Sequence, residues 1–275
     1  MDNTTNILLS AFQKDIRRCN PNCLYWTKEL SNIDVSLVWK KFHIIGSEDI
    51  GIASPYVQTF IKKQKTDFYN STNIWQMRTI LINTSNFLIH QNKSRLCDNV
   101  NHAYFKNYQP IVESREFSIL FDNFISAIND HDHRSAFLYA SHLYKMNKED
   151  VMIDILRIPI DEHADILIEL FHTYNLSESR GRTDILFLSH LILYRTFDLT
   201  KIQLNPEIKP LEVDDVKQLY SEETLPKYGD YVFDKHTDIG HKLGRDFEHF
   251  YNEGAKLVNC YLDDPYEEIA KKIIL

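Results

Sequence analysis

The chain has 275 residues, of which 43% are hydrophobic, and a formal net charge of −8. This composition is typical of a globular protein and excludes collagen-like and disordered classes. The longest apolar run falls short of the ~18 residues that a membrane-spanning helix needs, and residues 1–5 lack the features of a signal peptide, so we expect an intracellular protein, cytoplasmic or nuclear.

The content of only 7 Gly and 8 Pro favours helices over an all-β fold. Apolar residues recur at helical spacing in three early segments, at residues 7–18, 24–30 and 34–45. Asp34 is a natural N-cap of the third helix, which we expect Gly46-Ser47 to end. A fourth helix is expected to open at Ser54-Pro55, with proline at its first position.

The same spacing continues through the rest of the chain. It predicts further helices at residues 74–89, 117–128, 136–146, 151–158, 164–174 and 185–197. Residues 198–230 are rich in proline and are expected to form an extended connector. Helical residues 239–257 and a short acidic tail helix follow. The sequence therefore predicts an all-α, multi-helix bundle.

We expect three regions, at residues 1–115, 116–200 and 201–275, with the last docked on the body. Leu24-Tyr25 and Leu138-Tyr139 occupy similar places in two helical patterns, so two related helical units are one alternative. Residues 1–115 hold 14 Lys and Arg against 9 Asp and Glu, whereas the remainder holds 17 against 30. This asymmetry either places a polyanion at the basic end or reflects two solvated faces.

Three short blocks in the first sixty residues have a distinctive order. They read S-A-x-x-K-x-x-R at residues 10–17, L-Y-W-x-x-x-L at 24–30 and S-E-D-I-G-x-A-x-P at 47–55. In this order they resemble the C-terminal region of the RarA/MgsA replication-associated recombination ATPases and their Werner-helicase-interacting relatives. The resemblance covers residues 7–60.

The resemblance implies a clamp-loader-collar-like oligomerisation domain of the AAA+ proteins, which act in DNA replication and recombination at stalled forks. Its partners would be further copies of this chain or a related AAA+ ATPase, together with forked or single-stranded DNA. Because the chain begins at the collar, we expect it to act without an ATPase domain. It also lacks the G-x-x-x-x-G-K-[ST] loop that cradles phosphates, so we expect no nucleotide hydrolysis and no cofactor.

Two sets of residues in the front part of the chain are candidate contacts. The candidates for an oligomer interface are Tyr25, Trp26, Trp39, Glu48 and Asp49. The candidates for DNA contact are Arg17, Arg18, Lys40, Lys41, Lys62, Lys63 and Lys65. Aromatic side chains dominate interface energetics, and Lys and Arg neutralise phosphates. The alternatives are core packing for the aromatic residues, helix capping for the acids and a solvated surface for the cations.

A second segment, residues 234–249, is dense in polar and ionisable side chains. The candidates for ligand or partner binding are Asp234, His236, Thr237, Arg245 and His249. Asp234 can orient the imidazole of His236, while Arg245 and His249, expected one helical turn apart, can grip a phosphate or carboxylate. The alternative is a buried polar network that docks the C-terminal region.

The cysteines and histidines do not predict a metal site. Cys19 and Cys23 lie four residues apart, but no second close pair completes a zinc site. The sequence His131-Asp132-His133 falls in an expected loop, where its side chains do not point together.

Two functions remain open from the sequence. The first is a non-enzymatic replication or recombination accessory protein that oligomerises or docks on DNA-processing machinery. The second is an enzyme or ligand-binding protein that acts on nucleic acid or a phosphorylated ligand through residues 234–249. Convergence of Asp234, His236, Arg245 and His249 at an open pocket would favour the second, and their burial under helices would favour the first.

Overall fold

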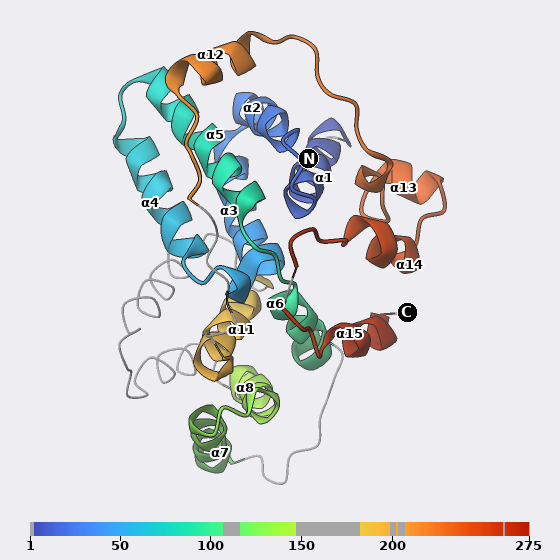
Figure 1. Cartoon of the computed structure of the whole chain (residues 1–275). Helices are drawn as coiled ribbons and strands as arrows, with labels where there is room; N and C mark the ends of the chain where they lie inside the picture. Colours follow the sequence, from blue (N-terminus) through green and yellow to red (C-terminus); the bar gives the residue numbers. More distant parts are fainter. Residues whose placement is uncertain are drawn as a thin grey trace.

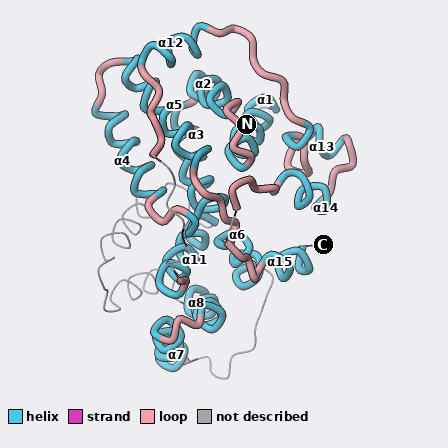
Figure 2. Tube along the Cα trace, viewed as in Figure 1, coloured by secondary structure: helices cyan, strands magenta, loops and turns pink. Residues whose placement is uncertain are grey.

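The computed structural model describes residues 3–106, 116–146, 182–198, 202, 207–260 and 262–274. Every regular element in these ranges is a helix, and none of the described residues forms a strand (Figures 1 and 2). The all-α prediction is confirmed. Within the same ranges, each helix is too short or too polar to cross a lipid bilayer.

Five helices form the first bundle (Figure 1). They are α1 (Asn3–Arg17), α2 (Cys23–Ile33), α3 (Val35–Ile45), α4 (Val57–Asn70) and α5 (Ile74–His90). Their apolar faces enclose a core whose largest side chains include Trp26, Trp39 and Phe12. The side chain of Asp34 accepts a hydrogen bond from a backbone N–H of α3, which confirms the predicted cap.

The third helix does not end at Gly46-Ser47, contrary to expectation. Gly46 keeps right-handed helical angles and its N–H bonds back to the carbonyl groups of α3. The chain therefore continues into the π-helix η1 (Gly46–Ile50) and the 3₁₀-helix η2 (Gly51–Ala53). The next α-helix begins at Val57, two residues later than predicted, because Pro55 lies in the preceding turn.

A second core adjoins the first bundle. Its elements are α6 (Leu96–Val100), the π-helix η3 (Asn101–Lys106), α7 (Phe117–Asn129), α8 (His133–Met146), α11 (Arg182–Thr196) and α15 (Glu267–Ile274). Leu96 and Val100 pack in this core, although the sequence placed residues 1–115 in one region. The boundary between the two cores is bridged by the η1–η2 turn, because Ile50 packs in the first core and Ile52 in the second.

The C-terminal strap, residues 207–260, wraps the first bundle (Figure 1). It contains α12 (Val213–Ser221), the 3₁₀-helix η5 (Asp230–Val232), α13 (Asp238–Lys242), α14 (Phe247–His249) and the π-helix η6 (Phe250–Gly254). At its start, Asn83 of α5 exchanges two hydrogen bonds with the backbone of Leu211. Farther along, Tyr25 of α2 donates to the carboxylate of Glu222. The strap thus docks on the first bundle, whereas α15 at the end of the C-terminal region belongs to the second core.

Two parts of the strap differ from the prediction. Helix α12 lies inside the expected connector, where Glu212 and Asp215 form a capping box that starts it. Residues 239–257 do not form one helix, because Gly244 adopts a φ of +68° after α13 and Asp246 is extended before α14. The predicted helices at residues 151–158 and 164–174 lie outside the described residues.

Candidate binding cavity

Residues from six parts of the fold line one cavity of about 640 Å³. They come from α1, from α3, from η1, from the start of α6 with η3, from α11 and from the strap. Its charged lining residues are Lys14, Arg17, Lys41, Glu48, Arg95, Asp98, Asp234 and Lys235. Two of the blocks that carry the family resemblance therefore meet the polar strap segment at one place.

Asp49 of η1 holds two arginines from behind the cavity wall. Its Oδ1 accepts from Nε of Arg17 at 2.8 Å and from Nη1 of Arg95 at 3.4 Å. Its Oδ2 accepts from the side-chain amide of Gln13 at 2.7 Å, and that amide also donates to Glu48 at 2.9 Å. Asp49 is fully buried and does not line the cavity, whereas both arginines do. The aspartate therefore fixes the two guanidinium groups side by side.

The turn after Asp49 requires glycine. Gly51 adopts a φ of +47°, and a Cβ at this position would lie only 3.0 Å from Sγ of Cys97. The turn sends Ile50 into one core and Ile52 into the other, while Asp49 faces α1. The S-E-D-I-G block is thus a bend that joins two cores and presents its acids to arginines.

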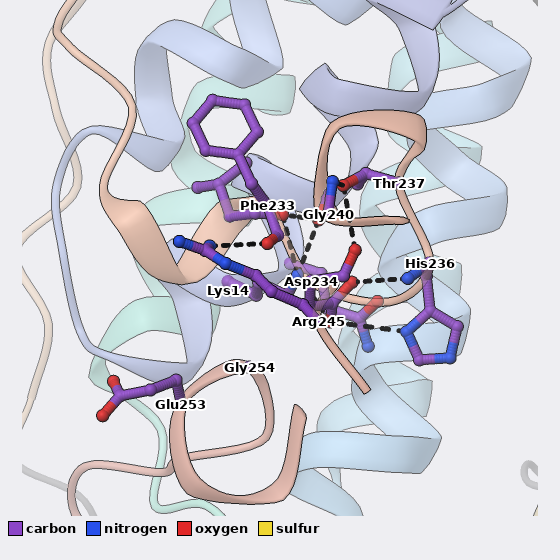
Figure 3. Close-up of polar contacts among 12 residues, drawn as sticks. Lys14, Phe233, Asp234, His236, Thr237, Gly240, Arg245, Glu253 and Gly254 are labelled. Atoms are coloured by element: carbon purple, nitrogen blue, oxygen red, sulfur yellow. Dashed lines mark hydrogen bonds and ion pairs between the residues drawn. The ribbon is translucent and has the colours of Figure 1, made fainter. Parts of the chain in front are cut away.

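Lys14 ties α1 to the strap (Figure 3). Its Nζ donates to Oδ2 of Asp234 at 2.7 Å, to the hydroxyl of Ser10 at 2.8 Å and to the carbonyl oxygen of Val232 at 2.9 Å. These three bonds use all the hydrogens of the ammonium group. Asp234 also accepts from the backbone N–H and from Nδ1 of His236. This pair therefore docks the strap on the first bundle.

Burial and pairing shift the pKa values of this pair in opposite ways. Burial lowers the pKa of Lys14 to about 8, although the charge of Asp234 raises it. Burial alone would raise the pKa of Asp234, but hydrogen bonds from His236 and the charge of Lys14 hold that pKa well below its ordinary value. Both groups are therefore charged at neutral pH, and the contact is ionic.

Arg95 brings a second guanidinium group to the cavity. It pairs with Asp98, and its guanidinium carbon lies 5.6 Å from the ring centroid of Phe250, which Arg17 approaches to 6.0 Å. Burial alone would lower the pKa of Arg95, but the carboxylates of Asp98 and Asp49 raise it, so the group stays charged. Its Nε is buried and has no hydrogen-bond partner among the described residues.

Three π-helices border the cavity. Glu48 comes from η1, His102 from η3, and Phe250 and Tyr251 from η6. A π-helix inserts an extra residue into a helical turn, and such insertions are frequent at functional sites. Their concentration around one cavity supports it as the candidate functional site.

Thr237 and Gly240 shape the turn that follows Asp234 (Figure 3). The hydroxyl of Thr237 donates to the carbonyl oxygen of Asp234 at 3.0 Å and accepts from the N–H of Gly240 at 3.1 Å. A Cβ on Gly240 would lie 1.8 Å from that carbonyl oxygen, so a side chain does not fit there. Thr237 is buried, and this candidate holds the turn rather than facing the cavity.

Arg245 and His249 do not grip a ligand together, contrary to expectation. They are not one helical turn apart, because Asp246 between them has extended backbone. Arg245 instead donates to the carbonyl oxygens of Asp230 and Phe233, and His249 does not line the cavity. Of the five candidates in residues 234–249, only Asp234 and His236 line the cavity.

The aromatic interface candidates lie inside the protein. Trp26 and Trp39 are each 1% exposed. Nε1 of Trp26 donates to Asp15 at 2.6 Å, and its ring stacks on Tyr228 of the strap. This corrects the expectation that the two indoles anchor a partner, because the first core and the strap already cover them. Tyr25, the third aromatic candidate, is half-buried against the strap.

The DNA-contact candidates separate into two groups. Arg17 and Lys41 line the cavity, and the Nζ of Lys41 donates to Gln13. Arg18 instead donates to Glu253 of the strap. The remaining candidates, Lys40, Lys62, Lys63 and Lys65, lie on α3 and α4 and do not line the cavity.

The loop at residues 131–133 contacts the second core. Asp132 accepts hydrogen bonds from the backbone N–H groups of Arg134 and Ser135, and Nδ1 of His133 contacts the hydroxyl of Tyr266. No group of three or more His, Cys, Asp or Glu within the described ranges is placed to hold a metal ion.

Several cavity residues were missed in the sequence. Gln13 follows Ser10 by three residues and precedes Arg17 by four, so helical spacing could have placed it on the same face of α1. Arg95 and Asp98 lie between the helices predicted at residues 74–89 and 117–128, where no element was predicted, and only the tertiary fold brings them to the cavity.

Comparisons with protein-family models, with curated proteins and with solved structures found no match. The resemblance to the RarA/MgsA collar therefore stays a prediction from the sequence.

Proposed function

We propose that this chain is a non-enzymatic accessory protein of DNA replication or recombination whose cavity docks a phosphate-bearing group of DNA. The observation that carries the proposal is the charge of the cavity. Five Lys and Arg line it against three Asp and Glu, in a chain whose net charge is −8. A cationic cavity in an acidic protein attracts anions to that place.

The lining carboxylates favour binding over acid–base catalysis. A general base works best when its pKa lies near the pH of the reaction. The pKa of Asp234 is held well below that range, and Asp98 pairs with Arg95. Glu48 accepts a hydrogen bond from Gln13. These acids position cations and amides in the wall.

The DNA context comes from the resemblance. Lys14 and Arg17 belong to the S-A-x-x-K-x-x-R block, and both side chains line the cavity. Glu48 of the S-E-D-I-G block lines it as well. Two of the three blocks that suggest a replication protein thus contribute residues to the proposed site.

Fluorescence anisotropy with labelled forked and single-stranded DNA tests the proposal. Replacing Lys41 and Lys235 together by alanine should weaken binding about tenfold or more, and wild-type binding should weaken steeply as salt rises. Lys227→Ala is the matched control, because Lys227 is exposed on the strap away from the cavity lining. Equal affinity of the cavity variant and the control, or no binding at low salt, contradicts the proposal.

A second candidate function is assembly with further copies of the chain or with a related AAA+ ATPase, as the resemblance implies. Four large apolar side chains of the first bundle favour it, because each is more than half exposed. They are Ile33, Tyr56, Tyr69 and Ile74. Tyr69 and Ile74 flank the turn between α4 and α5.

Light scattering of the purified protein tests assembly. Tyr69→Ser with Ile74→Ser should lower the oligomeric state, whereas Leu225→Ser, at an exposed apolar residue of the strap, should leave it unchanged. A wild-type monomer at high micromolar concentration that captures no ATPase partner contradicts this candidate.

A further inference from the structure

We infer that the cavity binds the terminal phosphate of a nucleotide, a phosphate monoester borne by a strand end or by a free mononucleotide, between Arg17 and Arg95. The inference rests on the proposed function for its DNA partner. It names the chemical group that the cavity would select.

The two guanidinium groups form a prepared pair. Arg17 and Arg95 are 4% and 8% exposed, and Oδ1 of Asp49 accepts from both. Asp49 holds the pair from behind the wall, and two lining carboxylates assist, because Asp98 pairs with Arg95 and Glu48 lies 3.9 Å from Arg17. Guanidinium groups match the oxygens of a phosphate with paired hydrogen bonds, and two fixed groups lose little freedom when they bind.

The pair has unused hydrogen-bond donors. Nε of Arg95 is buried without a partner among the described residues. Arg17 uses Nε for Asp49 and Nη1 for the carbonyl oxygen of Gly254, while its Nη2 lies 3.9 Å from Oε2 of Glu48, an ion pair too long for a hydrogen bond, so the Nη2 hydrogens can reach another acceptor. A buried donor without a partner is unfavourable, so Arg95 gains if its side chain turns Nε toward an oxyanion in the cavity that it lines.

Lys14 does not compete for this role. Its three ammonium hydrogens are taken by Asp234, Ser10 and Val232. The phosphate would therefore lie on the arginine side of the cavity, with Lys41 and Lys235 as further lining cations.

The volume of the cavity favours a terminal phosphate over a phosphate within a DNA duplex. Cavities of about 300–1,000 Å³ take ligands of the size of a nucleotide, and this one measures about 640 Å³. A duplex, whose major groove alone is about 12 Å wide, does not enter such a space. A strand end or a mononucleotide can bring its phosphate to the arginines.

The charge of the ligand favours the same group. A phosphate monoester carries about −1.5 to −2 at pH 7 and offers three terminal oxygens. An internal phosphodiester carries a single charge. The monoester therefore gains more from two guanidinium groups than the diester does.

Competition anisotropy with wild-type protein tests the inference without any mutation. A single-stranded 10-mer with a 5′-phosphate should bind about tenfold tighter than the same strand with a 5′-hydroxyl, and adenosine 5′-monophosphate should displace it where adenosine does not. Arg95→Lys keeps the positive charge but loses the paired N–H donors of the guanidinium group. This variant should therefore bind the 5′-phosphate and 5′-hydroxyl strands equally. If the Arg95 variant unfolds too easily to be measured, Lys41→Ala serves as a second variant. The side chain of Lys41 is half-buried and can be shortened.

The outcomes separate the inference from the proposed function. Equal binding of the phosphorylated and hydroxyl strands overturns the inference while DNA docking stands. Displacement by the mononucleotide without binding of any strand supports the phosphate monoester and overturns DNA docking. If neither strand nor mononucleotide binds, both fail.

Discussion

The first bundle with its strap and the second core are both helical, but they differ in the kinds of side chain that they bury. The first holds many buried charged side chains, among them Lys14, Asp15, Arg17, Lys28, Glu48, Asp49, Lys93 and Asp234. In the described residues of α7, α8 and α11, the buried polar side chains are Ser141, Ser189, His190 and Thr196, and none is an acid, a lysine or an arginine. Burial lowers the pKa of His190 to about 4, so this histidine is neutral.

The two regions therefore depend on buried charge to different degrees. A buried ion pair stabilises little compared with apolar packing of the same volume, yet losing one partner is costly because the other charge is left uncompensated. The first bundle and the adjoining α6, which carries Asp98, accept this risk around the cavity, while α7, α8 and α11 of the second core rely on apolar burial.

The positions of the three tryptophans allow the unfolding of the first bundle to be followed separately. Trp26, Trp39 and Trp75 all lie in the first bundle. Tryptophan fluorescence therefore follows the unfolding of that bundle, whereas far-UV circular dichroism follows the helices of both regions.

The largest effect is expected from Asp49→Asn. The change leaves Arg17 and Arg95 without their shared carboxylate, so the free energy of unfolding should fall by about 3–5 kcal/mol. Urea unfolding followed by tryptophan fluorescence measures it. Asp67→Asn, at an exposed residue of α4, should change the value by less than about 0.5 kcal/mol. A loss below about 1 kcal/mol for Asp49→Asn would show that the arginines find other partners.

Leu191→Ala should have the next largest effect, in the second core. Leu191 is fully buried in α11, and its truncation leaves a cavity that costs about 2–5 kcal/mol. The dichroism midpoint in urea should fall more than the fluorescence midpoint. Coincident midpoints in this variant would show that the two regions unfold as one unit.

A smaller effect concerns pH. The pKa of Asp234 is lower in the folded protein than in the unfolded chain, so its stabilising contribution is present above the ordinary carboxyl pKa of about 4 and is lost as the pH falls below it. Tryptophan fluorescence should report acid unfolding in this window. Asp234→Asn should flatten the dependence on pH, and an unchanged acid midpoint would count against the role of the pair.

The smallest effect is expected from His190→Leu. Both ring nitrogens of His190 are buried without a hydrogen-bond partner among the described residues. An apolar side chain of similar size removes that penalty, so stability should rise by up to about 1 kcal/mol or stay unchanged. Dichroism-detected thermal unfolding measures it, and a loss above about 2 kcal/mol would reveal a partner for the imidazole.

Local signals predicted much of the fold. The apolar spacing in α1, α5 and α7 gave these helices to within a few residues, because a helix that buries one face repeats every three to four residues. The cap at Asp34 was predictable, since it depends on atoms two residues away. The all-α class followed from the same local preferences and from the few glycines and prolines.

Only the tertiary structure decided the cavity and its partners. Lys14 bonds to the carbonyl oxygen of Val232, 218 residues away in the chain, and no spacing rule relates such positions. The polarity of Arg95 predicts a surface residue, whereas Asp49 and Asp98 make its burial possible. The sequence by itself thus determined which segments are helical, because helical hydrogen bonds and faces are local. The meeting of α1, η1, α6 and the strap at one polar cavity depends on long-range pairing of charges, which becomes defined only when the cores pack.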